Sequence, residues 1–134
     1  MRKIIYCADT IAIQNGHIVI IERLSSIRGL ALPGGKQEPN EMLSDTATRE
    51  FTEETGMQFT ALGVLGTYAE DDRDPRGHYG STVCTGTALG MPRDEPGKTH
   101  VLLLTKAEIL EREREFVFDH FLALQNFFSI NKEG

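Results

Sequence analysis

Two apolar segments near the start of the chain, 3–13 and 17–23, are separated by the dipeptide Asn15-Gly16. An Asn-Gly pair between two apolar runs is typical of the tight turn in a β-hairpin. The pattern therefore predicts a pair of antiparallel strands at this end of the chain. Three further runs of apolar and β-branched residues predict strands, at 57–69, 78–89 and 101–104.

The segment 42–55 contains neither Gly nor Pro and is predicted to be a helix, with Asn40 as its N-cap and Gly56 at its C-terminal stop. The stretch 24–40, rich in Ser, Gly and Pro, is interpreted as a long functional loop. Charged or Pro-rich turns are expected at 70–76 and 90–97. Two more helices are predicted at 106–114 and 118–128. Strands interrupted by a few helices indicate an α+β or α/β layered architecture.

The chain has 134 residues, 40% of them hydrophobic and 25% charged, which fits one globular domain over residues 1–134. Its net charge is −6, whereas a protein that binds nucleic acid through its phosphates needs a basic surface. We therefore expect no nucleic-acid partner. An anionic ligand would have to bring a cation with it.

Cys7 and Cys84 are too few for a disulfide framework, and no Cys/His cluster suggests zinc. The first residues carry positive charge as a secretion signal does, but Asp9 and Thr10 interrupt the apolar stretch that should follow. No apolar run approaches the roughly 20 residues needed to span a bilayer. These features predict a cytoplasmic protein without a membrane partner.

Three glutamates of the predicted helix 42–55 are spaced to share one face. Glu50, Glu53 and Glu54 stand at i, i+3 and i+4, so they fall within an arc of roughly 100°. A solvated acidic face would lie opposite the apolar stripe of its helix. Here the acidic residues lie beside the stripe formed by Leu43, Ala47 and Phe51, while Thr48 and Thr52 occupy the opposite side.

Like charges at this spacing repel one another, so a cation is expected between them. Arg49 can reach Glu53, but one guanidinium cannot neutralise three carboxylates. A set of oxygen ligands without His or Cys suits Mg²⁺ or Mn²⁺. The Gly34-Gly35 pair would let the backbone approach this site closely, and a carbonyl there would complete the coordination.

The spacing of these residues resembles the signature of the Nudix hydrolases at every fixed position. The match comprises Gly35, Glu41, Arg49-Glu50, Glu53-Glu54 and Gly56, with Phe51 at a position where the family more often has a smaller aliphatic residue. The resemblance implies an α/β fold, the α/β/α Nudix sandwich with a mixed β-sheet between helices. It also implies hydrolysis of a diphosphate bond in a nucleoside diphosphate linked to another group.

On this resemblance, Mg²⁺ or Mn²⁺ is expected on Glu50, Glu53 and Glu54 and on the Gly34 carbonyl, with Arg49 orienting its neighbouring glutamates. Glu41 is assigned a role in bracing the entry to the helix. The general base comes from this helix in some members and from a later loop in others, which leaves four candidates open: Glu53, Glu54, Asp94 and Glu95. Three basic residues are expected to contact substrate: Lys36, Arg28 and Arg76.

Two short stretches, Asp74 to His78 and Phe118 to His120, resemble the ADP-ribose pyrophosphatases of this family. The leading prediction is thus hydrolysis of ADP-ribose to AMP and ribose 5-phosphate. The alternatives are a MutT-like nucleoside triphosphate pyrophosphatase and a non-catalytic domain that senses a nucleotide, although the motif here is intact. The apolar final helix is compatible with a homodimer.

Overall fold

The computed structural model describes residues 4–69 and 76–131. Strands β1 (Ile5–Gln14) and β2 (His17–Arg23) pair antiparallel, with Gln14 opposite His17. Asn15 and Gly16, between them, both have positive φ, 50° and 76°, as the tight hairpin turn requires. The predicted hairpin is confirmed. The charged turn expected at 70–76 lies outside the described residues except for Arg76.

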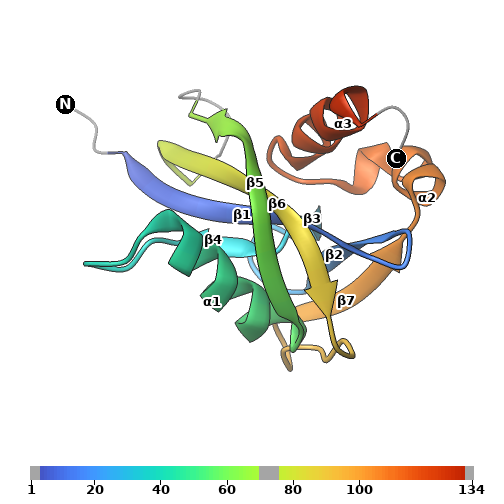
Figure 1. Cartoon of the computed structure of the whole chain (residues 1–134), viewed down its shortest axis with the longest axis horizontal. Coiled ribbons are helices and arrows are strands. Elements are labelled where there is room, and N and C mark those ends of the chain that lie inside the picture. Colours follow the sequence, from blue (N-terminus) through green and yellow to red (C-terminus); the bar gives the residue numbers. More distant parts are fainter. Residues whose placement is uncertain (1–3, 70–75, 132–134) are drawn as a thin grey trace.

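The two strands of the hairpin belong to a seven-stranded mixed sheet (Figure 1). Its strand order is β3 (Gly29–Ala31), β2, β1, β6 (Tyr79–Leu89) and β5 (Gln58–Tyr68), with β4 (Gly34–Lys36) paired to β1 and β7 (Thr99–Leu104) paired to β2. Strand β1 runs parallel to β6 (Tyr79–Leu89), and all other pairs are antiparallel. The remaining long strands are β5 (Gln58–Tyr68) and β7 (Thr99–Leu104). Each predicted strand is present, and β7 begins before the predicted residue 101.

The stretch 24–40, expected to be a loop, contains two three-residue strands. Strand β3 (Gly29–Ala31) pairs with β2, and β4 (Gly34–Lys36) pairs with β1. Their sequences lack the period of a strand, and only pairing with distant parts of the chain makes them extended. Strand β4 fixes the Gly34-Gly35 pair against β1, with Gly34 opposite Asp9.

Helix α1 spans Leu43–Thr55, and Gly56 ends it in the left-handed conformation as predicted. The prediction of Asn40 as N-cap is wrong. Met42 occupies that position, and the Asp45 carboxylate reaches back to accept a hydrogen bond of 3.2 Å from the Met42 N–H. Asn40 instead has a φ of 65°, so it takes part in the turn that precedes the helix.

The last third of the chain forms shorter helices than expected. The predicted helix 106–114 divides into α2 (Lys106–Glu111) and a 3₁₀ turn (Glu113–Glu115). Helix α3 (His120–Ile130) begins two residues later than predicted, because Phe118 has a φ of 58° that no α-helix can include. No helix in the described ranges is long and apolar enough to cross a bilayer.

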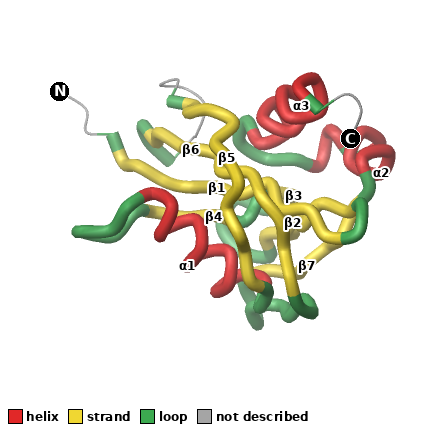
Figure 2. The backbone as a smooth tube through the Cα atoms, in the orientation of Figure 1, coloured by secondary structure: helices red, strands yellow, loops and turns green. Residues whose placement is uncertain are grey.

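The sheet has a hydrophobic core on each side. Ala47 and Phe51 of α1 pack on one face of the sheet, whereas Ile109 of α2 and Leu124 of α3 pack on the other. Figures 1 and 2 show α1 on one side of the sheet and α2 and α3 toward the other. The predicted α/β/α layering with a mixed sheet between helices is confirmed.

Candidate active site

The acidic face of α1 lies beside its buried face, as the sequence predicts. Phe51 is fully buried, while the side chains of Glu50 and Glu53 are 18% and 52% exposed. Glu54 is partly buried. The acidic face therefore adjoins packed structure and is only partly hydrated.

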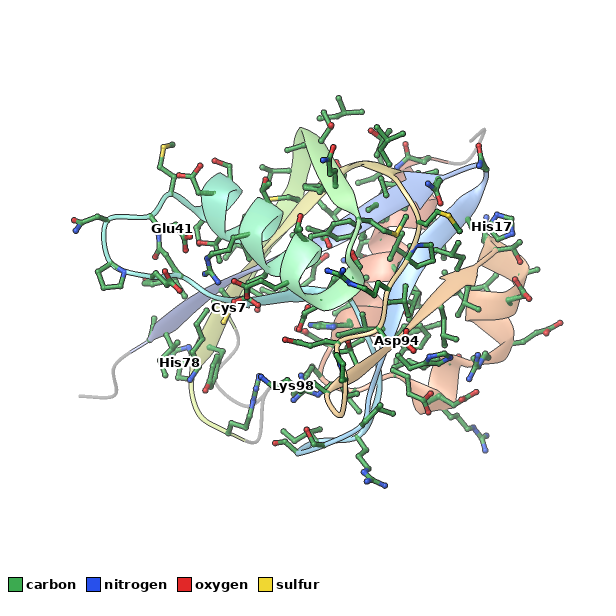
Figure 3. All side chains as sticks on the ribbon, turned by 90° about the horizontal axis from the view of Figure 1, so that it is seen from below. Cys7, His17, Glu41, His78, Asp94 and Lys98 are labelled. Atoms are coloured by element: carbon green, nitrogen blue, oxygen red, sulfur yellow. The ribbon has the colours of Figure 1, made fainter. Side chains whose placement is uncertain are left out.

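Arg49 ties the start of α1 to its acidic face. Its Nε and Nη2 donate to Glu41 over 2.8 and 3.0 Å, and its Nη1 donates to Glu50 over 2.7 Å. The Arg49 guanidinium, more than any other group, lowers the pKa of Glu41 to about 2. Figure 3 shows Glu41 where the loop enters α1. Arg49 thus contacts both Glu41 at the entry to the helix and Glu50 on its acidic face, and their roles stay predictions.

Glu54 joins the helix to strand β4. Its Oε1 accepts a hydrogen bond of 2.8 Å from the Gly34 N–H. Burial raises the pKa of Glu54 to about 8 against this hydrogen bond, and the carboxylates of Glu50, Asp9 and Glu95 raise it further. Burial, followed by Glu53 and Glu95, also raises the pKa of Glu50, and Arg49 opposes the shift. Negative charge is thus concentrated in one partly desolvated region.

The two glycines of β4 are needed for this close approach. A Cβ atom on Gly34 would overlap the Asp9 carboxylate, and one on Gly35 would overlap the Glu50 carboxylate. A side chain at position 34 would also overlap the backbone of β1, whereas one at position 35 would displace Glu50, so the backbone at Gly35 lies directly against the acidic face.

The loop between β6 and β7 brings Glu95 to the same region. The Arg93 N–H donates to the Thr55 carbonyl over 2.6 Å, and the Thr99 hydroxyl donates to the Glu54 carbonyl over 3.0 Å. Asp94 differs, because its carboxylate accepts from the Val101 N–H and lies 2.8 Å from the His100 ring (Figure 3). Of the two loop carboxylates predicted as bases, Glu95 is the one that raises the pKa values of Glu50 and Glu54.

The chemistry of this region fits a divalent cation. Its donors are carboxylate and backbone oxygens, which Mg²⁺ and Mn²⁺ prefer, and the pKa shifts of Glu50 and Glu54 show that a positive charge would be stabilised there. The three helix glutamates do not form a preassembled cluster. Over 4–69 and 76–131, no three His, Cys, Asp or Glu side chains are grouped closely enough to hold a metal ion. Glu50 and Glu54 point to Arg49 and Gly34 instead.

A pocket opens beside Gly34 and Gly35, and Lys36 and Arg76, two of the three basic residues predicted to contact substrate, are among the residues that line it. Arg28 lies elsewhere, in a second hollow with Arg114 and Glu115. Sequence reasoning missed Arg23, which borders both pockets. It also missed Asp9, which lines the first pocket. A single carboxylate within an apolar strand was the sequence feature that could have indicated this residue.

Comparison with known proteins places the chain in a family. The family model described as "NUDIX domain" matches residues 7–125. An ADP-ribose pyrophosphatase of Methanocaldococcus jannaschii is 40% identical over 84 residues, which cover 61% of this chain and 50% of that protein. A putative 8-oxo-dGTP diphosphatase of Bacillus subtilis is 49% identical over 41 residues, or 31% of this chain and 26% of that protein. The chain thus aligns with half or less of each of these relatives.

Solved structures share the fold. A bifunctional NMN adenylyltransferase/ADP ribose pyrophosphatase of Francisella tularensis, complexed with AMP and a manganese ion, superposes with a TM-score of 0.84 at 22% identity, over 97% of this chain and 42% of that one. The NUDIX domain of Shewanella oneidensis NrtR, complexed with ADP ribose, gives a TM-score of 0.79 at 18% identity, over 97% and 88%.

Proposed function

Because the chain belongs to the Nudix family, we propose that it hydrolyses the diphosphate bond of a nucleoside diphosphate sugar, with ADP-ribose converted to AMP and ribose 5-phosphate. The observation that carries this proposal is the continuity of two sites. Gly34 contacts Glu54 of the acidic helix on one side and lines the pocket with Arg23, Lys36 and Arg76 on the other. One substrate can therefore reach the carboxylates with its diphosphate and the pocket with an attached group.

In this proposal Glu50, Glu53, Glu54 and the Gly34 carbonyl hold Mg²⁺ or Mn²⁺. A bound divalent ion offsets charge on the diphosphate oxygens and lowers the pKa of a coordinated water. Arg49 keeps Glu50 in position, while Lys36 and Arg76 offset the remaining charge of the substrate. The net charge of −6 makes these cations necessary for an anionic substrate.

We assign the proton-accepting role to Glu95. A carboxylate that binds a cation becomes a weaker base, which disfavours the helix glutamates for this task. Glu95 lies on a loop fastened to the end of α1 and faces Glu50 and Glu54, yet its side chain is 30% exposed. It can therefore accept the proton of the attacking water and return it to solvent. The new bond joins water oxygen to phosphorus, and the bridging phosphorus–oxygen bond breaks.

A substrate panel tests this function. Turnover of ADP-ribose, NADH, diadenosine polyphosphates and nucleoside triphosphates is measured with Mg²⁺, with Mn²⁺ and with EDTA. The proposal expects metal-dependent turnover with the highest kcat/KM for ADP-ribose and equal amounts of AMP and ribose 5-phosphate. Preference for triphosphates would support the second candidate instead.

That second candidate, a MutT-like nucleoside triphosphate pyrophosphatase, is favoured by the similarity to the Bacillus subtilis protein. The longer match to the Methanocaldococcus jannaschii protein and the cationic pocket beside Gly34 favour the nucleoside diphosphate sugar. A purely sensory domain would not require the complete set of glutamates. A cytoplasmic location and a homodimer remain predictions from the sequence.

A further inference from the structure

Asp9 lines the pocket beside Gly34 and is buried, with 5% of its surface exposed. Its Oδ2 has no hydrogen-bond partner, and no other buried side-chain nitrogen or oxygen within the described ranges is in this position. Burying a carboxylate oxygen without a hydrogen-bond partner destabilises a fold, because the oxygen loses its contacts with water and gains none in return. An acceptor kept in this state on a residue that lines a pocket points to a ligand that donates a hydrogen bond.

His120 cannot serve as that donor in its present geometry. Its Nδ1 accepts a hydrogen bond of 2.9 Å from the Leu32 N–H, so the proton of the neutral ring is on Nε2. Nε2 lies 3.4 Å from Asp9 Oδ2 without the alignment of a hydrogen bond. Held by Leu32, the ring keeps one side of the Asp9 carboxylate away from water.

Three cationic side chains, those of Arg23, Lys36 and Arg76, line the pocket. The Arg76 guanidinium lies 4.7 Å from the ring centroids of both Tyr79 and Phe118, and that of Arg23 lies 5.3 Å from Phe118. Lys36 Nζ lies 5.8 Å from the Tyr79 ring. These distances lie within the range of cation–π attraction, so the pocket combines cationic side chains with aromatic rings.

Phe118 holds its place through an unfavourable backbone conformation. Its φ of 58° lies in the left-handed region, which is strained for a residue other than glycine. This conformation ends the preceding segment immediately before α3 and packs the Phe118 ring 5.2 Å from that of His120. The same pocket is therefore lined by a residue with a strained backbone, Phe118, and by a residue with a buried oxygen that has no hydrogen-bond partner, Asp9.

We propose that this pocket takes the phosphorylated sugar attached to the nucleoside diphosphate, and that a sugar hydroxyl donates a hydrogen bond to Asp9 Oδ2. The inference rests on the proposed function and refines it. A cationic rim suits phosphate, and a single buried acceptor beneath it suits a hydroxyl rather than another phosphate, which Asp9 would repel. Asp9 thereby selects nucleoside diphosphate sugars against nucleoside triphosphates, which carry no sugar at that end.

The test compares Asp9→Asn with the wild type on two substrates, ADP-ribose and the β-methyl ester of ADP, which share adenosine and the anhydride bond. The wild type is expected to prefer ADP-ribose. In Asp9→Asn, that preference, the ratio of the two kcat/KM values, should fall about 10- to 100-fold, as expected for a lost charged hydrogen bond. Glu111→Gln, an exposed carboxylate-to-amide change on α2, should leave the ratio unchanged. An equal loss on both substrates would overturn the inference.

The thermal midpoint of unfolding of Asp9→Asn gives a second readout. If Asp9 had only a structural role, the substitution would lower this midpoint. Replacing a buried carboxylate that has one oxygen without a hydrogen bond by an amide should leave the thermal midpoint of metal-free protein unchanged or higher. A lower midpoint together with an unchanged substrate ratio would make Asp9 a structural residue and contradict the proposal.

A third measurement uses ligand binding to the wild-type protein. It depends neither on the folding of the variant nor on turnover. Calorimetry in EDTA compares ribose 5-phosphate with inorganic phosphate, and the proposal expects tighter binding of the sugar phosphate. Equal binding of the two would refute the sugar pocket even where ADP-ribose is hydrolysed. Failure to hydrolyse either ADP compound would instead refute the proposed function, and the calorimetry would still decide the pocket.

Discussion

The Gly34 N–H and the Glu54 carboxylate, 20 residues apart in sequence, are joined by a hydrogen bond of 2.8 Å. This bond places a partly buried acidic side chain against the backbone that lines the pocket beside Gly34. Burial disfavours the ionised form of Glu54 and raises its pKa to about 8. The site therefore holds charge that the metal-free fold does not favour.

Thermal unfolding of metal-free protein at pH 5 and pH 8.5 measures that cost. Because the folded-state pKa of Glu54 lies above its ordinary value of 4.5, the stabilisation is present at pH 5 and is lost as pH rises through about 8. In Glu54→Gln the amide oxygen still accepts from Gly34, so we expect a midpoint about 3–8 °C above wild type at pH 8.5, equivalent to about 1–2 kcal/mol. Equal pH dependence in both proteins would contradict the assigned burial.

Glu41 predicts the opposite pH behaviour. Arg49 lowers its pKa to about 2, so its stabilising contribution is complete above about pH 4.5 and is lost as pH falls toward 2. Glu41→Gln should reduce the loss of stability on acidification and lower kcat/KM about tenfold at pH 7, because Arg49 would hold Glu50 less firmly. Glu38→Gln, whose carboxylate is 3.6 Å from Arg49, is the control and should change both properties less.

Gly35 offers a steric test of the acidic site. In Gly35→Ala the new methyl group would displace the Glu50 carboxylate, so the Mg²⁺ concentration for half-maximal rate should rise about tenfold or more. Gly66→Ala is a matched control on β5, because a Cβ there meets nothing within 4 Å. A normal metal requirement in Gly35→Ala would remove Glu50 from the metal site.

The role of Glu95 can be separated from metal binding. Glu95→Gln should lower kcat about 10²- to 10³-fold while the half-saturating Mg²⁺ concentration stays within about threefold of wild type. The metal titration is followed by the initial rate of ADP-ribose hydrolysis, with Glu111→Gln as the control. If kcat is unaffected, the proton acceptor lies on α1 and the assignment is wrong.

Local sequence features predicted most of the fold and the acidic face of α1. Asn15-Gly16 identified the hairpin, and the spacing of Glu50, Glu53 and Glu54 placed them beside buried Phe51. Such features act between near neighbours in the chain, so their outcome depends little on the remainder of the fold.

Features that depend on distant pairing were not predictable. Strands β3 and β4 are extended because they pair with β2 and β1. Helix α3 begins after Phe118, because the backbone of Phe118 is in the left-handed conformation. The pocket beside Gly34 combines Asp9 of β1 with His120 of α3, and no spacing in the sequence indicates that the two meet. The motif therefore indicated the proposed reaction centre, whereas the residues proposed for specificity became apparent only from the fold.

The most direct test of the central claim is the turnover of ADP-ribose by Glu53→Gln and Glu54→Gln at saturating Mg²⁺, with circular dichroism confirming that both variants fold. Gln supports a helix about as well as Glu, so a loss of rate would reflect the missing charge. The account predicts that kcat falls by orders of magnitude in each variant. Undiminished turnover in both would contradict it.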